Sequence, residues 1–122
     1  MDSRTFIWLF FGFSGRIGRM VYFLANIFAG LFPLFAIYRL SLLPEGAGAE
    51  SGWLLFFWIF AILGLWAQLA LGVKRFHDFG KPGILAVTLF IPLFAFIVLV
   101  VLCLYPGDSG PNSYGEHTDE PK

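Results

Sequence analysis

Three long stretches of this chain contain no Asp, Glu, Lys or Arg, and they constrain its fold more than any other feature. They cover residues 20–38, 51–73 and 82–107, which are 19, 23 and 26 residues long. About 20 apolar residues, at a rise of 1.5 Å per residue, cross a hydrocarbon layer of about 30 Å. Each stretch is therefore long enough to span a membrane as a helix.

A strand interpretation of these stretches fails on two grounds. They show no alternation of polar and apolar residues, and an open sheet leaves backbone groups unsatisfied in lipid. Only 13% of the residues are charged and 58% are hydrophobic, whereas soluble domains carry about 25% charged residues. The sequence predicts an all-α integral membrane protein with three transmembrane helices and a short N-terminal interfacial helix.

The apolar run TFIWLFFGF, at residues 5–13, is too short to cross a membrane. It follows Arg4 as a signal-peptide core would, but no small-x-small cleavage pattern comes after it. We expect it to lie in the membrane interface instead. The predicted single domain consists of an N-terminal interfacial segment 1–19, transmembrane helices 20–38, 51–73 and 82–105, an outer loop 39–50, a cytoplasmic loop 74–81, and a Gly/Pro turn with an acidic tail 106–122.

The charged residues divide unequally between the two predicted membrane faces, although the net charge is zero. With three spans, the residues before the first span share a face with those between the second and third. That face carries six cations and two carboxylates, a net charge of +4, and the other carries two cations and six carboxylates, a net charge of −4. Because cytoplasmic segments are enriched in Lys and Arg, this pattern predicts a cytoplasmic N-terminus and a C-terminus outside.

Asn26, Gln68 and Thr88 interrupt the predicted spans as uncharged polar residues, each six or seven positions from a basic residue. At 1.5 Å per residue, all three lie roughly 10 Å from the cytoplasmic face. Side chains at one depth can bond between helices and fix their packing, at around 0.6 kcal/mol each. The alternative is a small polar pocket open to the cytoplasm. We favour packing, because Thr is common in spans and can bond within its own helix.

Two basic motifs, GRIGR at 15–19 and KRFHDFGK at 74–81, form the predicted cytoplasmic rim. Two spans begin on this face, so two positive helix ends lie near these cations, and Pro82 suits a first helical turn. A lipid phosphate is the anion that such a surface favours. The candidate anion- or lipid-binding residues are Arg16, Arg19, Lys74, Arg75, His77, Asp78 and Lys81.

A plainer interpretation treats the same residues as topology anchors, with Asp78 paired to Arg75 or Arg16. The presence of His77 beside Asp78, within five residues of three cations, exceeds what orientation alone requires. Both interpretations stay open at this point.

Other site chemistries find little support. Ser14, His77 and Asp78 do not suit a catalytic triad, because adjacent His and Asp rarely point at one another. Cys103, the single cysteine, and His117 are predicted to lie far from His77, which leaves no metal cluster. The basic residues form no extended surface for nucleic acid. We expect no enzyme activity, cofactor, metal or nucleic-acid partner.

Three motifs occur in order along the chain, FSGRIGRMVYF at 13–23, KRFHDFGKPG at 74–83 and YPGDSGPNSYG at 105–115. Together they resemble the F-x-GR-x-x-R, RR-x-HD and PG-x-x-GPN-x-YG pattern of the YhaH-like small bacterial inner-membrane proteins, a family catalogued as a domain of unknown function. The resemblance implies a bacterial inner-membrane location. It also implies the signature residues Gly15, Arg16, Arg19, Arg75, His77, Asp78, Gly107, Gly110, Asn112, Tyr114 and Gly115.

The chain departs from that pattern in two places. Lys74 stands where the family usually has Arg, and Lys-Pro-Gly at 81–83 replaces a turn of the Ser-Gly-Trp type. These departures put in doubt any role that needs a paired guanidinium or that turn. The family supplies no reaction, substrate or cofactor.

The function expected from the sequence is that of a non-enzymatic inner-membrane protein of unknown biochemical activity. It would act through its rim by association with anionic lipids or other membrane proteins, including a second copy of itself. The alternative is a component of an oligomeric transporter or channel, which the absence of ionisable residues within the spans weakens. The weakest alternative is an enzyme that acts on a lipid headgroup through His77 and Asp78.

Overall fold

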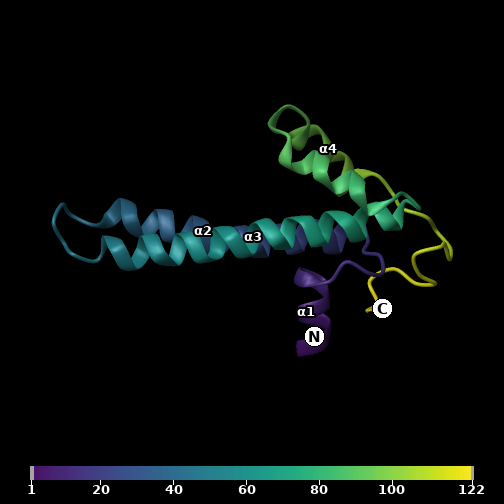
Figure 1. Cartoon of the computed structure of the whole chain (residues 1–122), viewed down its shortest axis with the longest axis horizontal. Helices are drawn as coiled ribbons and strands as arrows, with labels where there is room; N and C mark the ends of the chain where they lie inside the picture. Colours follow the sequence, from purple (N-terminus) through teal and green to yellow (C-terminus); the bar gives the residue numbers. More distant parts are fainter. Residues whose placement is uncertain (1, 122) are drawn as a thin grey trace.

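A computed structural model describes residues 2–121 as an all-helical protein built around two long helices (Figure 1). The helices are α1 (Ser3–Phe11), α2 (Arg19–Leu42), α3 (Glu50–Asp78) and α4 (Pro92–Leu104), and a 3-10 helix η1 (Gly83–Phe90) lies between α3 and α4. The described residues contain no strand. The predicted all-α class is therefore confirmed.

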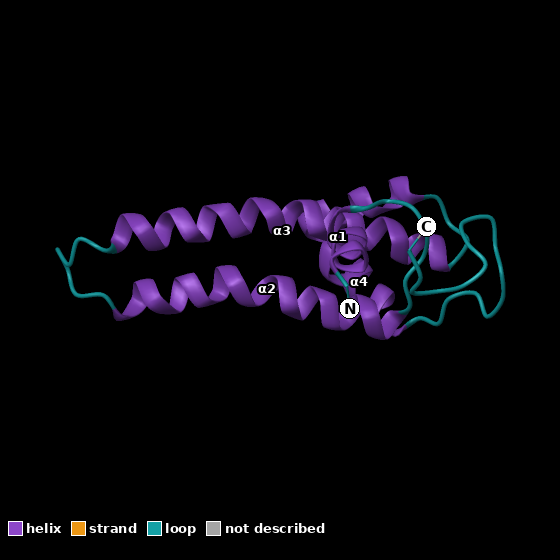
Figure 2. Ribbon diagram, turned by 90° about the horizontal axis from the view of Figure 1, so that it is seen from below, coloured by secondary structure: helices purple, strands orange, loops and turns teal. Residues whose placement is uncertain are grey.

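The helices α2 and α3 run antiparallel and side by side, joined by residues 43–49 (Figure 2). Both are candidate membrane spans, with 24 and 29 residues and mean hydropathies of 2.0 and 2.2. They correspond to the first two predicted spans. The sequence predicts a loop at 74–81. However, α3 continues to Asp78, so the KRFHD sequence forms the end of this helix instead. Basic residues in a last turn stabilise a helix through its macrodipole.

The third charge-free stretch does not form one helix, which corrects the predicted span 82–105. The chain passes through η1, turns at Ile91 and returns as α4 (Figure 1). Ile91 is extended, with φ −96° and ψ 110°, because Pro92 disfavours the α conformation at the residue before it. The 13 residues of α4 extend about 20 Å, which is short of a hydrocarbon layer of about 30 Å.

Two glycines allow this apolar hairpin to start against the last turns of α3. A Cβ atom on Gly72 would lie 2.7 Å from Leu89 Cδ1, and one on Gly83 would lie 2.6 Å from Val73 Cγ1. A larger residue at either position would push η1 away from α3. The η1–α4 hairpin then leaves the long helices at an angle, on the side opposite α1 (Figure 1).

The short helix α1 lies nearly perpendicular to α2 and α3 (Figures 1 and 2). It begins after Asp2, whose Oδ1 accepts a hydrogen bond of 2.8 Å from the backbone N–H of Thr5. Such a cap satisfies one of the free N–H groups of the first turn. The helix covers most of the apolar run that the sequence analysis assigned to the interface, and its Leu9 and Phe10 are buried.

The C-terminal segment lies at the same end of the α2–α3 hairpin as the two rim motifs, which corrects the predicted placement on opposite faces. The backbone N–H of Asp108 donates to the carbonyl of Asp78 at 2.6 Å, and that of Asp119 donates to the carbonyl of Arg16 at 2.8 Å. A third stretch that turns back at Ile91 returns the chain to the end it left. The acidic tail therefore joins the basic rim.

Burial is concentrated at this rim end. Ile17, Tyr22, Leu71 and Leu102 are fully buried there, whereas apolar side chains elsewhere are largely open, such as that of Leu93 at 78% exposure. An apolar surface of this extent is typical of a protein that is solvated by lipid.

Candidate functional site

Five charged or titratable side chains at the rim end are buried, although residues of these types are rarely buried unless paired. We call this set the rim network. Its members come from the loop before α2 and from the last turns of α3. The C-terminal tail contacts four of them, and α1 contacts Lys74. They are Arg16, Lys74, Arg75, His77 and Asp78, with exposures between 0% and 9%.

The carboxylate of Asp78 lies at the centre of the rim network. Its Oδ1 accepts from Arg16 Nε at 2.8 Å and from the Thr118 hydroxyl at 2.5 Å, and its Oδ2 accepts from Arg75 Nη1 at 2.9 Å. One carboxylate thus faces two buried guanidinium groups. The second positive charge requires further acceptors, because an uncompensated buried charge is costly.

Backbone carbonyls of the tail supply those acceptors for Arg16. Its Nη1 donates to Gly110 O at 2.7 Å and to Gly115 O at 3.3 Å, and its Nη2 donates to Asp108 O at 2.6 Å. These bonds fix the turn motif of the tail around one side chain. The tail is therefore part of the folded rim and not a loose appendage.

Arg75 connects the network to α4. Its Nε donates to Leu102 O at 2.7 Å and its Nη2 to Tyr105 O, the last carbonyls as the chain leaves α4. The guanidinium also lies 4.4 Å from the centre of the Phe79 ring. A cation at the carbonyl end of a helix is favourable, so Arg75 holds α4 against α3.

Lys74 performs the same role for α1. Its Nζ donates to the carbonyls of Trp8, Leu9 and Gly12 at 2.6–2.7 Å, and it lies 5.0 Å from the centre of the Trp8 ring. Of these carbonyls, that of Trp8 also accepts from the backbone N–H of Gly12 at 3.0 Å, whereas those of Leu9 and Gly12 have no backbone partner among the described residues, as is usual at the end of a helix. Three donors are what an ammonium offers, so Lys74 uses all of them to fix the end of α1.

His77 and the tail residue Tyr114 stack with their ring centres 4.0 Å apart and an angle of 5° between the planes. Nδ1 of His77 lies 2.8 Å from the carbonyl oxygen of Gly15. Asn112 in turn donates to the backbone carbonyl of His77 at 2.9 Å. The third motif is thereby joined to the other two.

The glycine positions of the motifs follow from this packing. Gly15 has φ +87° and Gly80 has φ +74°, conformations that favour glycine, and Gly80 ends α3. A Cβ atom on Gly107 would overlap the carboxylate of Asp78 and lie 2.8 Å from its carbonyl oxygen. By contrast, a Cβ on Gly110 would meet nothing within 4 Å; this glycine contributes its carbonyl instead.

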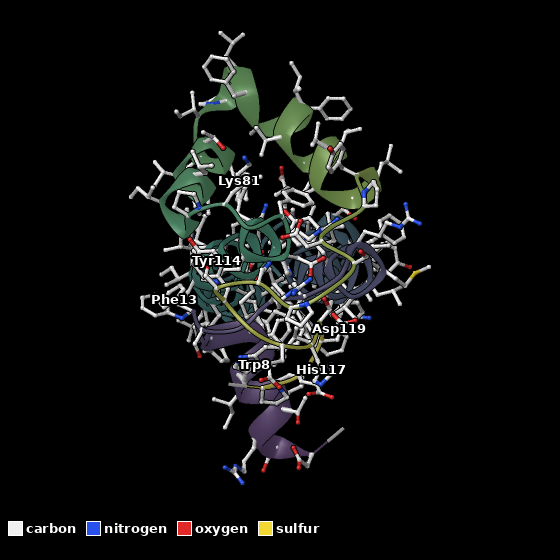
Figure 3. The ribbon with its side chains drawn as sticks, turned by 90° about the vertical axis from the view of Figure 1, so that its right-hand side faces the viewer. Trp8, Phe13, Lys81, Tyr114, His117 and Asp119 are labelled. Carbon is white, nitrogen blue, oxygen red and sulfur yellow. The ribbon has the colours of Figure 1, made fainter. Side chains whose placement is uncertain are left out.

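Asp119 ties the end of the tail to the start of α2. Its Oδ1 accepts from the backbone N–H of Gly18 at 2.6 Å, which is the N-cap residue of α2. Burial raises the pKa of Asp119 above the usual value, and the Gly18 hydrogen bond opposes that shift. From the end of the hairpin, Asp119 and Tyr114 lie on the tail between Trp8 on α1 and Lys81 (Figure 3).

The structure separates the candidate anion-binding residues into two groups. The donors of Arg16, Lys74 and Arg75 point to protein acceptors in the buried network. Arg19 and Lys81 are exposed, and within residues 2–121 Arg19 makes a single polar contact, from Nη1 to Leu104 O at 3.1 Å. Only the second group offers charge to an outside ligand.

The sequence predicts that the polar layer of Asn26, Gln68 and Thr88 forms hydrogen bonds between helices, but these residues form no such bond to another described helix. Asn26 donates to Tyr22 O at 2.8 Å and Thr88 to Leu85 O at 2.7 Å, both within their own helices. Asn26 and Gln68 do line one cleft, between α2 and α3. Thr88 does not line it.

Sequence reasoning missed three partners of the network: Trp8, Thr118 and Asp119. Nothing in the residue types marks them, because Trp8 acts through its carbonyl and ring and Thr118 through a single hydroxyl.

Among the described residues, no group of three or more His, Cys, Asp or Glu is placed to hold a metal ion.

The fold and the rim together define a class of protein: a small helical membrane protein whose two long apolar helices are joined at one end by a buried ionic network. The chain belongs to the family described as "Protein of unknown function (DUF805)", which matches residues 10–116. The predicted membership of a membrane-protein family of unknown function is confirmed; the narrower likeness to YhaH stays a prediction.

The chain is also 30% identical over 105 residues to Inner membrane protein YhaI of Escherichia coli strain K12. The aligned residues cover 85% of this chain and 83% of that protein. The same values hold for Inner membrane protein YhaI of E. coli O157:H7. No solved structure matches the chain. Neither the family description nor these names indicate a biochemical activity.

Proposed function

We propose that this chain is a non-enzymatic inner-membrane protein that acts by association with anionic lipids, and that its termini share the cytoplasmic face. The inner-membrane location is supported by the relative named YhaI and by the two long apolar helices. Its η1–α4 hairpin would enter the membrane and return to the same face.

The proposed orientation rests on where the cations gather. Seven Lys and Arg residues lie within the described residues, and six of them belong to α1, the rim motifs or the end of α3. Only Arg39 lies near the other end of the hairpin. Because orientation follows Lys and Arg and depends little on Asp and Glu, the acidic tail at the rim does not reverse this preference.

One observation carries the lipid proposal. The buried cations of the rim network donate their hydrogen bonds to acceptors of the protein itself, so these cations stabilise the fold. Arg19 and Lys81 remain exposed at the rim, where the apolar surfaces of α2 and η1 begin. A cation beside an apolar surface suits a lipid with an anionic headgroup, at about 1 kcal/mol for each cation.

Replacing both exposed cations, as Arg19→Gln with Lys81→Gln, should lower the preference for phosphatidylglycerol over phosphatidylcholine by up to about thirtyfold. The preference is measured by native mass spectrometry of the detergent-purified protein titrated with each lipid. Arg16 and Arg75 are unsuitable for this test, because their removal would disrupt the buried network.

Arg39→Gln is the matched control, since Arg39 is an exposed arginine at the opposite end of α2. It should leave the preference between the two lipids unchanged. Equal preference in the double variant and the wild-type protein would refute the proposal. Thermal unfolding in detergent shows whether both variants keep the fold.

The transporter alternative is not favoured by any contact in the structure. The charged residues of α2 and α3 lie in the terminal turns of these helices, whereas transport paths are marked by ionisable residues within the spans.

A further inference from the structure

A cleft of about 280 Å³ opens between α2 and α3, in the part of the helices that the lipid would cover. The two carboxamides of the polar layer line it, at roughly 10 Å from the rim cations. Most of the other positions in its wall are small or apolar. The lining residues used here are Asn26, Gly30, Ala61, Gly64, Leu65 and Gln68.

The carboxamide of Gln68 makes no hydrogen bond to any residue that the structure describes. That of Asn26 donates to the carbonyl of Tyr22, which leaves its oxygen as an acceptor. A carboxamide offers two donors and an acceptor with two lone pairs. Leaving such groups unpaired in an apolar solvent costs free energy, so the cleft requires an occupant that both donates and accepts.

The chemistry of the candidates separates them. Lipid tails carry no hydrogen-bonding group, and an ester carbonyl of a lipid accepts but cannot donate. A second carboxamide does both, and two identical side chains can satisfy one another across a two-fold axis. Polar side chains at matching depth are a known means of joining helices in membranes.

The surroundings of the cleft allow a close approach. Gly30, Gly64 and Ala61 present little side chain, and a Cβ atom on either glycine would meet nothing within 4 Å. Backbones can come near each other at such small residues.

We propose that this cleft is the contact face for a second copy of the chain, in which Gln68 bonds to the carboxamides of Gln68 and Asn26 on the other copy. The dimer is independent of the lipid association proposed above, because it uses neither Arg19 nor Lys81.

Disulfide crosslinking in native membranes tests the dimer. In a Cys103→Ala background, Leu65→Cys, which lines the cleft, should give a crosslinked dimer under mild oxidation. Ile62→Cys is the matched control, because Ile62 is similarly open, at 63% exposure against 58% for Leu65, and does not line the cleft. Adding Gln68→Leu to the Leu65→Cys protein should lower the dimer yield by about threefold to twentyfold.

Two further measurements keep the result interpretable. Gln68→Leu should keep the melting temperature of the detergent-solubilised monomer, because Gln68 has no bond to lose within one copy. Thr88→Val, a polar change whose hydroxyl bonds its own helix, should not alter the dimer. The proposal is overturned by equal crosslinking at positions 62 and 65, or by a Gln68→Leu dimer as abundant as that of the parent protein. It is also overturned if the protein stays monomeric in lipid nanodiscs at all protein-to-lipid ratios, in which case water or lipid fills the cleft.

Discussion

Gly107 packs directly against Asp78, and this position requires glycine because the side chain of any other residue would occupy the space of the carboxylate. Asp78 is in turn held by Arg16, Arg75 and Thr118. At this scale a motif residue is explained by what it touches. Gly107 provides space, Gly110 provides a carbonyl, and Arg16 donates hydrogen bonds to the carbonyls of this turn.

The two glycines give a matched test. Gly107→Ala should lower the free energy of unfolding by about 1–3 kcal/mol, because an added carbon in a packed site forces its neighbours to shift. Gly110→Ala should change it by less than about 0.5 kcal/mol, because the added carbon enters open space. Thermal or denaturant unfolding in detergent measures both. Similar losses in the two variants would contradict this account of the turn.

The helices α1 and α4 are each bonded to α3 by a buried cation. Lys74 binds the final carbonyls of α1, and Arg75 binds those at the end of α4. The two residues are adjacent on α3, yet they bond to helices that lie on opposite sides of the α2–α3 hairpin (Figure 1). The element scale therefore explains why KRFHD continues the helix.

Lys74→Met should release α1 while the α2–α3 hairpin stays folded. The methionine keeps the length of the side chain but leaves the carbonyls of Leu9 and Gly12 without a donor, at about 1–3 kcal/mol for each buried unsatisfied group. Hydrogen exchange of the amides of residues 5–11 should accelerate by roughly tenfold for every 1.4 kcal/mol lost.

Lys81→Met is the control for this experiment, because Lys81 is exposed and its side chain bonds no described residue. It should leave exchange in α1 unchanged. Unchanged exchange in Lys74→Met would show that apolar packing of Leu9 and Phe10 is enough to hold the helix.

At the scale of the whole molecule, the three motifs form one network only if both ends of the chain lie on one face. The bonds of Arg16 to the tail and of Asp78 to Thr118 require it. The turn at Ile91 makes it feasible, because the third apolar stretch turns back toward the end of the α2–α3 hairpin that it left.

Reporter fusions measure this arrangement directly. Green fluorescent protein fused to the C-terminus should fluoresce, because it folds only in the cytoplasm, and alkaline phosphatase fused there should be inactive. The same phosphatase inserted in the loop at 43–49 should be active. An active C-terminal phosphatase would restore the arrangement with three spans and rule out the rim network in the membrane.

The sequence alone determined the features that depend on local composition. Absence of charge over 19 and 23 residues was enough to locate α2 and α3, and a helix is the solution that satisfies their backbone in lipid. The sequence also predicts one rim for GRIGR and KRFHD, because both flank helix ends on the same predicted face. The pairing of Asp78 with Arg75 or Arg16 belongs to one of two interpretations that the sequence leaves open, and the structure shows both ion pairs.

Tertiary structure decided how the third stretch folds and what the rim cations bind. A run of 26 uncharged residues is compatible with a span or a hairpin, and contacts of Gly72 and Gly83 with their neighbours favour the hairpin. Exposed and buried arginines cannot be distinguished by residue type. Arg16 and Arg75 became structural because the returning tail brought carbonyls to them, whereas Arg19 stayed exposed at the start of α2.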